Sequence, residues 1–317
     1  MAIRWDCMGP INGMNDSIVK YFSLEEYINS IKVNDNVLFH LEETNKNLDK
    51  YLKYLTQFDD YSVVYYWIDS LSKEIKFSQE IENHYINPFD MLNNNMFFDS
   101  FQMNHEMIKK LHQFVMNSDV MDDYRCDGEE VRVSFFSKKN LEEYIYWRGA
   151  LSNDVQRFMD DFIKIYKNNS VPIIDTDPFL KSALASLLFV RIHPFLDGNG
   201  RTSRMIYNIK FTDCINKIYN TNLKLCPLNI SRGIFMYKIS YANRINDIYF
   251  DLEHNSNDEI NKWFDFILNR VDDEIYFNTN RISSLENALN NLQRMKFTDS
   301  SNLPIESSKM KINNIKK

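Results

Sequence analysis

Glycine is scarce in this chain, with seven among 317 residues, and cysteine is scarcer still, with four. The cysteines lie far apart and form no Cys-x-x-Cys pair, which argues against a zinc knuckle or a disulfide framework and suits a reducing compartment. Lys and Arg number 37 against 44 Asp and Glu, a formal net charge of −7. Because sequence-independent affinity for nucleic acid comes from concentrated basic residues, nucleic acid is not an expected partner.

Long apolar runs are also missing. The longest, residues 183–190, is far too short to cross a bilayer, and the N-terminus has no signal-peptide stretch. We therefore expect a cytoplasmic protein without a membrane partner. The sequence shows no repeat of fixed period, and its 44% hydrophobic and 14% aromatic residues are enough for a sizeable core.

The spacing of apolar residues predicts a mainly α fold. Apolar side chains recur at three and four over about 15–86, 105–116 and 151–168. A further helix is predicted to begin at Pro178, after the N-cap carboxylate of Asp177. It should end near His193, because the following proline disfavours helical backbone at that residue.

Helical character resumes over 201–211 and continues through 231–277, whereas residues 131–136 alternate as in a strand after a turn-like Cys126-Asp127-Gly128. We therefore expect one small β-hairpin in a helical protein. Three regions are predicted: an N-terminal helical regulatory region over 1–95, a core over 96–277, and a C-terminal helix with a flexible tail over 278–317. From 282 on, the sequence drifts into Ser, Asn and Lys and is expected to be loose at its end.

Two of the seven glycines fall within three consecutive positions of one segment, IHPFLDGNGRTSR at 192–204. Gly198-Asn199-Gly200 falls at the first turn of the second predicted helix, where backbone N–H groups have no intrahelical acceptor and the macrodipole supplies roughly half a positive charge. Glycine lets the backbone approach a ligand without a Cβ in the way. The sequence therefore predicts a phosphate-binding turn.

The neighbours of this turn supply further chemistry. Arg201 and Arg204 are three apart, so they lie on one helical face and can offer fork-shaped donors to one anion. Asp197 is a hard oxygen ligand, suited to a Mg²⁺ held mostly by phosphate oxygens and water. His193 is the only nearby residue whose ordinary pKa, about 6.5, allows proton abstraction at neutral pH.

Each of these features also has an ordinary structural explanation. A Gly-Asn-Gly is usually a turn, a single histidine is usually a satisfied surface or core residue, and an arginine pair is usually a solvated face. Together, however, they match H-x-F-x-[DE]-G-N-G-R-x-x-R at every fixed position. At about one in twenty per residue type, eight such matches arise by chance with a probability on the order of 10⁻¹⁰ per start position.

This motif resembles the signature of the Fic family, whose members mostly transfer AMP from ATP to a protein hydroxyl. The likeness covers roughly residues 96–275 and includes Tyr124-Arg125 and the strand at 131–136, where the family has its target-binding flap. It implies a Fic-type helical bundle with a small β-hairpin flap near the active site. An exposed flap strand could pair with an extended loop of the target. The corresponding flap residues are Arg132, Val133 and Ser134.

The resemblance also assigns a role to each motif residue. His193 is the general base, Asp197 binds Mg²⁺, and Phe195 anchors the loop in the core. The residues expected to bind the nucleotide are Asp197, Gly198, Asn199, Gly200, Arg201 and Arg204. ATP is then the co-substrate, Mg²⁺ the cofactor, and the partner is a protein with an accessible Ser, Thr or Tyr hydroxyl, the chain itself included.

The transferred group is less closely defined. Relatives with lysine in place of the second glycine act as kinases, so Gly200 favours AMP transfer. Transfer of another nucleotide or of phosphocholine stays open, because the motif does not specify the base or sugar.

A second element lies upstream, where SQEIEN at 78–83 matches the family's inhibitory pattern [ST]-x-x-x-E-[GN] through Ser78, Glu82 and Asn83. In relatives this glutamate pairs with the second motif arginine, here Arg204. Such a carboxylate removes a cation that should meet the γ-phosphate and repels that phosphate. The alternative is a solvated helix face in a chain rich in Ser, Glu and Asn. Some such relatives also remove AMP, using the glutamate to align water, which gives a second hypothesis.

Two other classes of function compete with a transferase. A nucleotide-sensing module would bind ATP and seldom turn it over, but the presence of His193 and Asp197 counts against it. A nucleic-acid-binding regulator with a winged helix is disfavoured because residues 282–317 are short and irregular. Whether the chain forms a homo-oligomer stays open.

Overall fold

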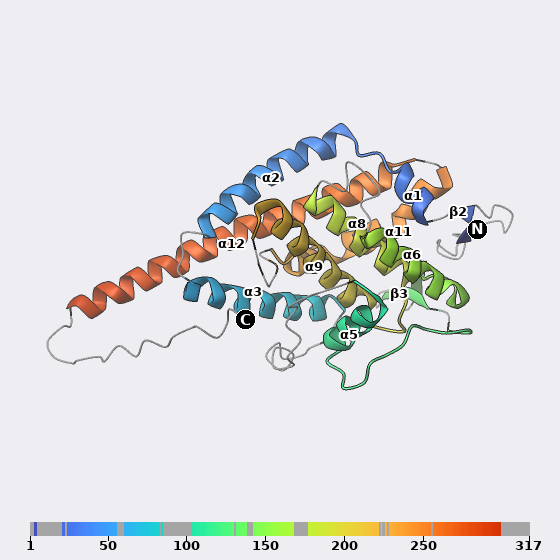
Figure 1. Ribbon diagram of the computed structural model, residues 1–317, viewed down its shortest axis with the longest axis horizontal. Helices are drawn as coiled ribbons and strands as arrows, with labels where there is room; N and C mark the ends of the chain where they lie inside the picture. Colours follow the sequence, from blue (N-terminus) through green and yellow to red (C-terminus); the bar gives the residue numbers. More distant parts are fainter. Residues whose placement is uncertain are drawn as a thin grey trace. The chain divides into compact units, whose positions relative to one another are not determined.

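The computed structural model (Figure 1) describes residues 3–4, 21–22, 24–55, 60–82, 84, 103–129, 131–137, 142–167, 177–221, 223, 226, 228–254 and 256–298. Residues 1–276 form one compact unit and residues 277–317 a second. The boundary predicted at residue 95, which follows Pro88 and the Asn run at 93–95, lies outside the described residues.

Helices make up most of the described chain. The N-terminal part contains β1 (Ile3–Arg4), β2 (Tyr21–Phe22), α1 (Leu24–Ser30), α2 (Asp35–Leu55) and α3 (Asp60–Ile81). The middle part contains α5 (His105–Met116), β3 (Arg132–Ser137), β4 (Glu142–Arg148), the short 3₁₀ turn η2 (Ser152–Asp154) and α6 (Val155–Lys167). The remaining helices are α8 (Pro178–Ile192), α9 (Asn199–Tyr219), α10 (Ser231–Met236), α11 (Lys238–His254) and α12 (Asp258–Thr298).

The core is built around α8 and α9. Helix α8 is buried on almost every face and packs against both α6 and α9. Small polar residues line part of its contact with α9, where the hydroxyls of Ser186 and Ser203 lie 2.7 Å apart. The predicted start of α8 is confirmed: the Asp177 carboxylate accepts hydrogen bonds from the N–H groups of Phe179 and Leu180 at 2.8 and 2.9 Å.

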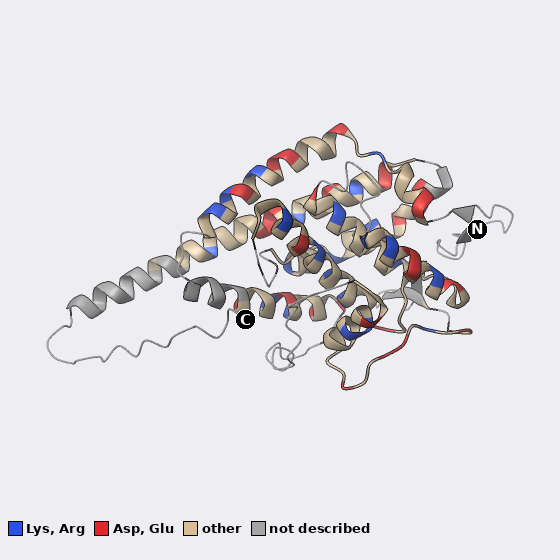
Figure 2. Cartoon of the chain, viewed as in Figure 1, with Lys and Arg blue, Asp and Glu red and all other residues tan. Residues whose placement is uncertain are grey.

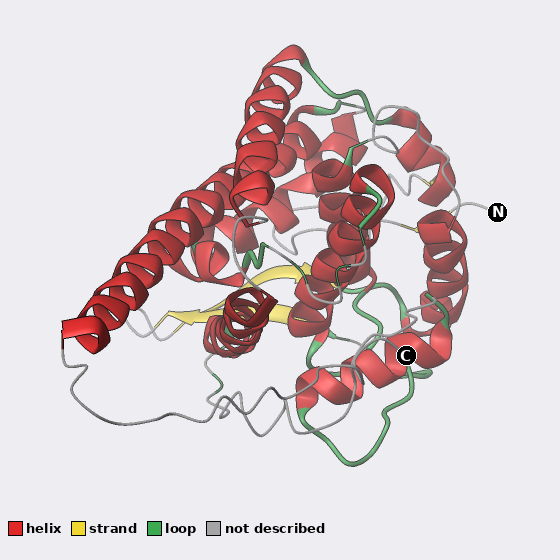
Figure 3. Ribbon diagram, turned by 60° about the vertical axis from the view of Figure 1, so that its left-hand side comes forward, coloured by secondary structure: helices red, strands yellow, loops and turns green. Residues whose placement is uncertain are grey.

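The two longer strands, β3 and β4, pair antiparallel with an irregularity between Val133 and Ser134 (Figure 3). The strand predicted over 131–136 is therefore present, one residue later in the chain. Helices α5 and α6 also confirm the periodicity over 105–116 and 151–168. Along α2, acidic and basic residues are interspersed (Figure 2).

The C-terminal helix expected within 278–317 is present as the end of α12, which continues to Thr298. The Ser and Asn residues of this stretch are interspersed with Leu, Ala, Glu and Arg, which favour helix strongly enough to continue it. Helical structure was also expected from about residue 15, but Tyr21–Phe22 pair as a short strand with Ile3–Arg4.

Helix α3 is fixed to the rest of its unit by polar contacts at every fourth residue. Ser70 accepts a hydrogen bond from Asn229, and Glu74 accepts two from the backbone and hydroxyl of Ser231, at the start of α10. At the next two of these positions, Ser78 and Glu82 accept hydrogen bonds from Arg204 of α9. We call Ser70, Glu74, Ser78 and Glu82 the polar seam. The buried side chains of Leu71 and Ile75 lie on the same helix.

Candidate active site

The segment between α8 and α9 forms a short loop that is fixed from within. Asn199, the first residue of α9, is 1% exposed, and its amide both accepts from the N–H of Phe195 at 2.9 Å and donates to the carbonyl of Phe195 at 2.8 Å. Phe195 is itself 1% exposed, which confirms its predicted packing role. The side chain of Asn199 therefore shapes the loop, and only its backbone N–H remains to meet a ligand.

The two glycines of the loop have different reasons to be glycine. Gly198 has φ +73°, and a Cβ there would lie 2.4 Å from the sulfur of Met116 and 2.9 Å from Nε2 of His112. Gly200 has no such backbone requirement, but its Cβ would lie 2.3 Å from a carboxylate oxygen of Glu82. The first glycine thus lets α5 approach the loop, and the second lets Glu82 approach α9.

His193 caps the C-terminus of α8 in the left-handed conformation, with φ +55°. Its Nδ1 lies 3.1 Å from the carbonyl oxygen of Val190. A carbonyl can only accept, so Nδ1 carries the proton and Nε2 keeps a lone pair. Burial lowers the pKa of His193 to about 4. At neutral pH the imidazole is therefore uncharged, with the tautomer that a general base needs.

Arg125 holds the end of α8 in place. Its buried guanidinium donates to the backbone oxygens of His193 at 2.7 Å and Glu129 at 3.0 Å, and also to Ala150. The backbone N–H of Arg125 donates to the oxygen of Pro194 at 2.8 Å. Arg125 thus holds backbone oxygens of three separate segments, and its charge suits the negative end of a helix dipole.

The two arginines of α9 converge on Glu82, which follows the last residue of α3. Oε2 of Glu82 lies 2.7 Å from Nε of Arg201, and Oε1 accepts a hydrogen bond from Arg204 at 2.8 Å. Arg201 also donates to Asp197 at 3.0 Å and to Gln79 at 3.1 Å. Glu82 was expected to pair with Arg204 alone, and the structure adds Arg201.

The contacts of Ser78 strengthen this arrangement. Its hydroxyl and its carbonyl accept hydrogen bonds from Arg204 at 2.9 and 2.8 Å. Asn83, the third residue of the inhibitory pattern, lies outside the described residues. Burial opposes the charge on Arg204, but Glu82 outweighs this and holds the pKa of Arg204 above its ordinary value.

Asp197 is more exposed than its partners. Its Oδ1 accepts from the N–H of Gly198 at 2.6 Å, and its Oδ2 meets Arg201. Partial burial raises its pKa, but these donors outweigh that effect and hold the pKa of Asp197 below its ordinary value. Among the described residues there is no group of three His, Cys, Asp or Glu side chains that could hold a metal ion. A single carboxylate fits Mg²⁺ only when phosphate oxygens and water supply the other ligands.

Two residues of this region, His112 and Gln79, received no role from the sequence, and a third, Arg125, was placed only with the flap. His112 lies against the loop, Arg125 holds the end of α8, and Gln79 donates to the carbonyl of Val115 at 2.8 Å while accepting from Arg201. His112 belongs to the apolar stripe of α5, so a polar residue on a buried face was a usable signal. Nothing in the sequence pattern marked Gln79.

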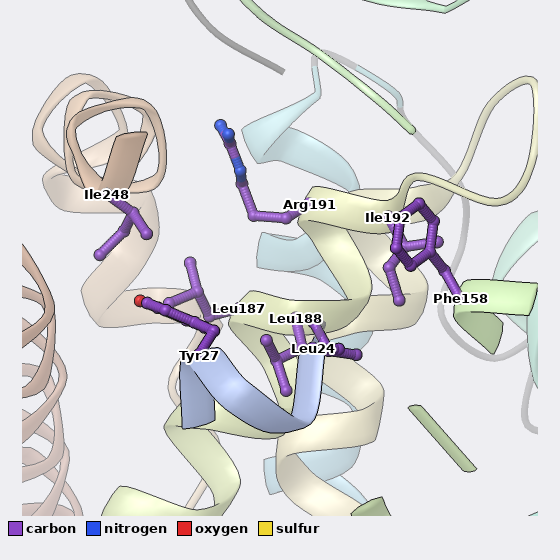
Figure 4. A pocket seen from close by; sticks show the side chains of 8 residues that line it. All are labelled: Leu24, Tyr27, Phe158, Leu187, Leu188, Arg191, Ile192 and Ile248. Atoms are coloured by element: carbon purple, nitrogen blue, oxygen red, sulfur yellow. The ribbon is translucent and has the colours of Figure 1, made fainter. Parts of the chain in front are cut away.

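The flap residues Arg132, Val133 and Ser134 lie in β3, for which only the backbone is described. A cavity of about 10 Å³, lined by side chains of α1, α6, α8 and α11, lies elsewhere in the unit (Figure 4). It has room for about one water molecule and cannot hold a nucleotide. The candidate site is therefore the loop itself, with its cationic groups covered by Glu82.

The fold and the loop define a helical protein in which two buried arginines near the N-terminus of α9 pair with carboxylates. Residues 102–209 match the model of the Fic/DOC family. The chain is similar to a Fic family protein from Desulfovibrio desulfuricans G20, with a TM-score of 0.56 and 14% identity over 80% of this chain and 76% of that one. It is also similar to a Fic domain containing signaling protein from Bacteroides thetaiotaomicron VPI-5482, with a TM-score of 0.51 and 14% identity over 77% and 97%.

At these identities the two structures show a shared fold. The family match covers residues 102–209, and the two structures show that the chain has the fold of Fic family proteins. The family supports a transferase of the nucleotidyl or a related kind. Among the described helices, none has the length and apolar composition needed to span a membrane.

Proposed function

We propose that this protein transfers AMP from ATP to a Ser, Thr or Tyr hydroxyl of a protein, and that Glu82 restrains this activity. The observation that carries the proposal is the double contact of Glu82 with Arg201 and Arg204, at 2.7 and 2.8 Å, beside the N-terminus of α9. Both arginines are buried, at 3% and 1% exposure. Two buried cations at a helix N-terminus favour an anion strongly.

Protein carboxylates already pair with these cations. Glu82 covers both arginines, while Asp197 accepts from the N–H of Gly198 and from Arg201. These oxygens stand where phosphate oxygens of ATP would bind. Nucleotide binding would then exchange one set of oxygens for another and leave no cation unpaired.

The chain's own residues account for the transfer. Nε2 of neutral His193 takes the proton of the target hydroxyl, whose oxygen forms a bond to the α-phosphorus of ATP. The bond from that phosphorus to the bridging oxygen breaks, and pyrophosphate leaves with its electron pair. Arg201, Arg204 and the N–H groups of the first turn of α9 stabilise the charge on the phosphates. Mg²⁺ held by Asp197 and phosphate oxygens would supply further charge neutralisation.

The restraint follows from charge and space. With Glu82 in place, the negative charge beside Arg204 repels a γ-phosphate, and the cations that should bind it are already paired. Gly200 leaves so little room that a Cβ would lie within 2.3 Å of the Glu82 carboxylate. We infer that Glu82 must move before a triphosphate binds productively.

Labelled ATP tests the proposal. We expect Glu82→Gly to raise transfer of AMP to protein above the wild-type level, and Glu82→Gly combined with His193→Ala to abolish it. Mass spectrometry after incubation with ATP and cell lysate should show a gain of one AMP on protein. Equal transfer by the wild type and Glu82→Gly contradicts the restraint, and a gain of another mass contradicts AMP as the transferred group.

A further inference from the structure

His112 of α5 touches the loop at a point that the proposed chemistry does not use. Its imidazole, 1% exposed, stacks on the ring of Phe195 with 3.8 Å between centroids and 15° between planes. Its Nε2 lies 2.9 Å from the carbonyl oxygen of Asp197. That oxygen can only accept, so Nε2 carries a proton and donates. The imidazole is thus fixed both by stacking and by a directed hydrogen bond.

This bond determines the direction of one backbone N–H. In a planar trans peptide the C=O and the N–H point in opposite directions. Holding the oxygen of Asp197 against α5 therefore turns the N–H of Gly198 away from α5. That N–H donates to Oδ1 of Asp197, whose Oδ2 meets Arg201. The N–H and the guanidinium consequently face the same anion.

Sterics alone do not fix this peptide. Glycine adopts both signs of φ at similar cost, so the peptide before Gly198 could rotate. The close approach of His112, whose Nε2 would be only 2.9 Å from a Cβ on Gly198, depends on the same glycine. The residue that permits a tight turn thus also requires an anchor for it.

We propose that His112 is a positioning residue, which keeps the N–H of Gly198 turned toward the phosphates and so sets the affinity for nucleotide. This inference rests on the proposed function. It acts on binding and leaves the proton transfer by His193 unchanged. A hydrogen bond to a charged phosphate contributes about 1.5 kcal/mol or more, so its loss should weaken binding roughly 10-fold.

The test uses the full chain carrying Glu82→Gly, which frees the arginines. His112→Phe keeps the stacking on Phe195 and removes the donor, whereas His112→Gln places an amide N–H near the position of Nε2. Phe114→Leu shortens another side chain of the same helix. It is the control for effects that come only from a loss of stability. The probe is Mg²⁺ with α,β-methylene-ATP, in which the bond to be broken cannot be cleaved, and calorimetry gives its Kd.

We expect His112→Phe to raise this Kd roughly 10-fold, with kcat for AMP transfer at saturating ATP changed by less than about twofold. His112→Gln should recover most of the affinity, and Phe114→Leu should leave it unchanged. Without nucleotide, hydrogen exchange over 195–200 should be faster in His112→Phe than in His112→Gln.

Two outcomes overturn the inference: an unchanged Kd in His112→Phe, or equal losses in the Phe and Gln variants. If the Glu82→Gly parent itself binds no α,β-methylene-ATP, the nucleotide site fails and the inference fails with it. Binding by the parent without any effect of His112→Phe refutes the inference alone.

Discussion

Replacing Glu82 with glutamine removes one negative charge while keeping the shape of the side chain. In the wild type this carboxylate meets Arg201 and Arg204 at 2.7 and 2.8 Å, and it is 23% exposed where the arginines are almost fully buried. Breaking a buried ion pair costs about 3 to 5 kcal/mol. Because Glu82 is partly solvated, about 2 to 3 kcal/mol is the more suitable figure for its displacement by a triphosphate.

That free energy predicts a specific gain in affinity. If Mg²⁺-bound ATP must displace Glu82 first, then Glu82→Gln should bind it roughly 30- to 150-fold more tightly than the wild type. Isothermal titration calorimetry with α,β-methylene-ATP measures this ratio. Without nucleotide the variant should melt at a lower temperature, because two buried guanidinium groups lose their counter-charge. Saturating ligand should then raise its melting temperature more than that of the wild type.

Glu80→Gln is the matched control, because Glu80 lies on the same helix and faces Lys76, at 3.9 Å, in place of the arginines of α9. It should change neither the affinity for nucleotide nor its effect on melting. Equal affinity in the wild type and Glu82→Gln refutes the reasoning. So does an equal gain in Glu80→Gln, which would trace the effect to the net charge of α3.

Three further outcomes follow from the loop. Asn199→Ala should lower the free energy of unfolding by about 2 to 3 kcal/mol, because it leaves the buried N–H and C=O of Phe195 unpaired, and a urea midpoint equal to that of the wild type would contradict this. His193 has a pKa of about 4 when folded and 6.5 when exposed, so only the unfolded chain gains a proton between these values. Stability should therefore fall by about 2 kcal/mol from pH 7 to pH 5, and a His193→Gln chain losing as much over this range would disprove that origin. Arg125→Lys should cost about 2 to 4 kcal/mol, since one ammonium cannot reach all the backbone oxygens that the guanidinium holds, and an unchanged thermal midpoint would speak against this role.

The sequence predicted the elements around the loop well because their signals are local. Asp177 and Pro178 mark a helix start through N-cap chemistry, and the proline after His193 marks the end of that helix. The roles of Gly198 and Gly200 were predicted only in part. A close approach to backbone was expected, but the side chains that make it, Met116 and Glu82, come from distant helices.

Without the family pattern, the sequence could not predict contacts between helices that lie far apart along the chain. The pairing of Glu82 with Arg204 followed from the inhibitory motif, but its contact with Arg201 depends on how α3 docks beside α9. The anchoring of the loop by His112 likewise depends on the packing of α5, because stacking on Phe195 joins residues 83 positions apart in the chain.

The polar seam of α3 alternates Ser70, Glu74, Ser78 and Glu82, and this alternation has a consequence for how the helix can move. Four residues of helix advance the chain by about 6 Å, so a slide of one step would exchange carboxylates and hydroxyls at the partners of the seam. A slide that moved Ser78 to the position of Glu82 would leave Arg201 facing a hydroxyl, whereas the opposite slide would bring the carboxylate of Glu74 to the Asn229 side chain. Intermediate positions are thus heavily penalised. We expect α3 to occupy one of two positions, either bound in this register or withdrawn from it. A signal acting through α3 would then change the fraction of active molecules and leave the rate of each active molecule unchanged.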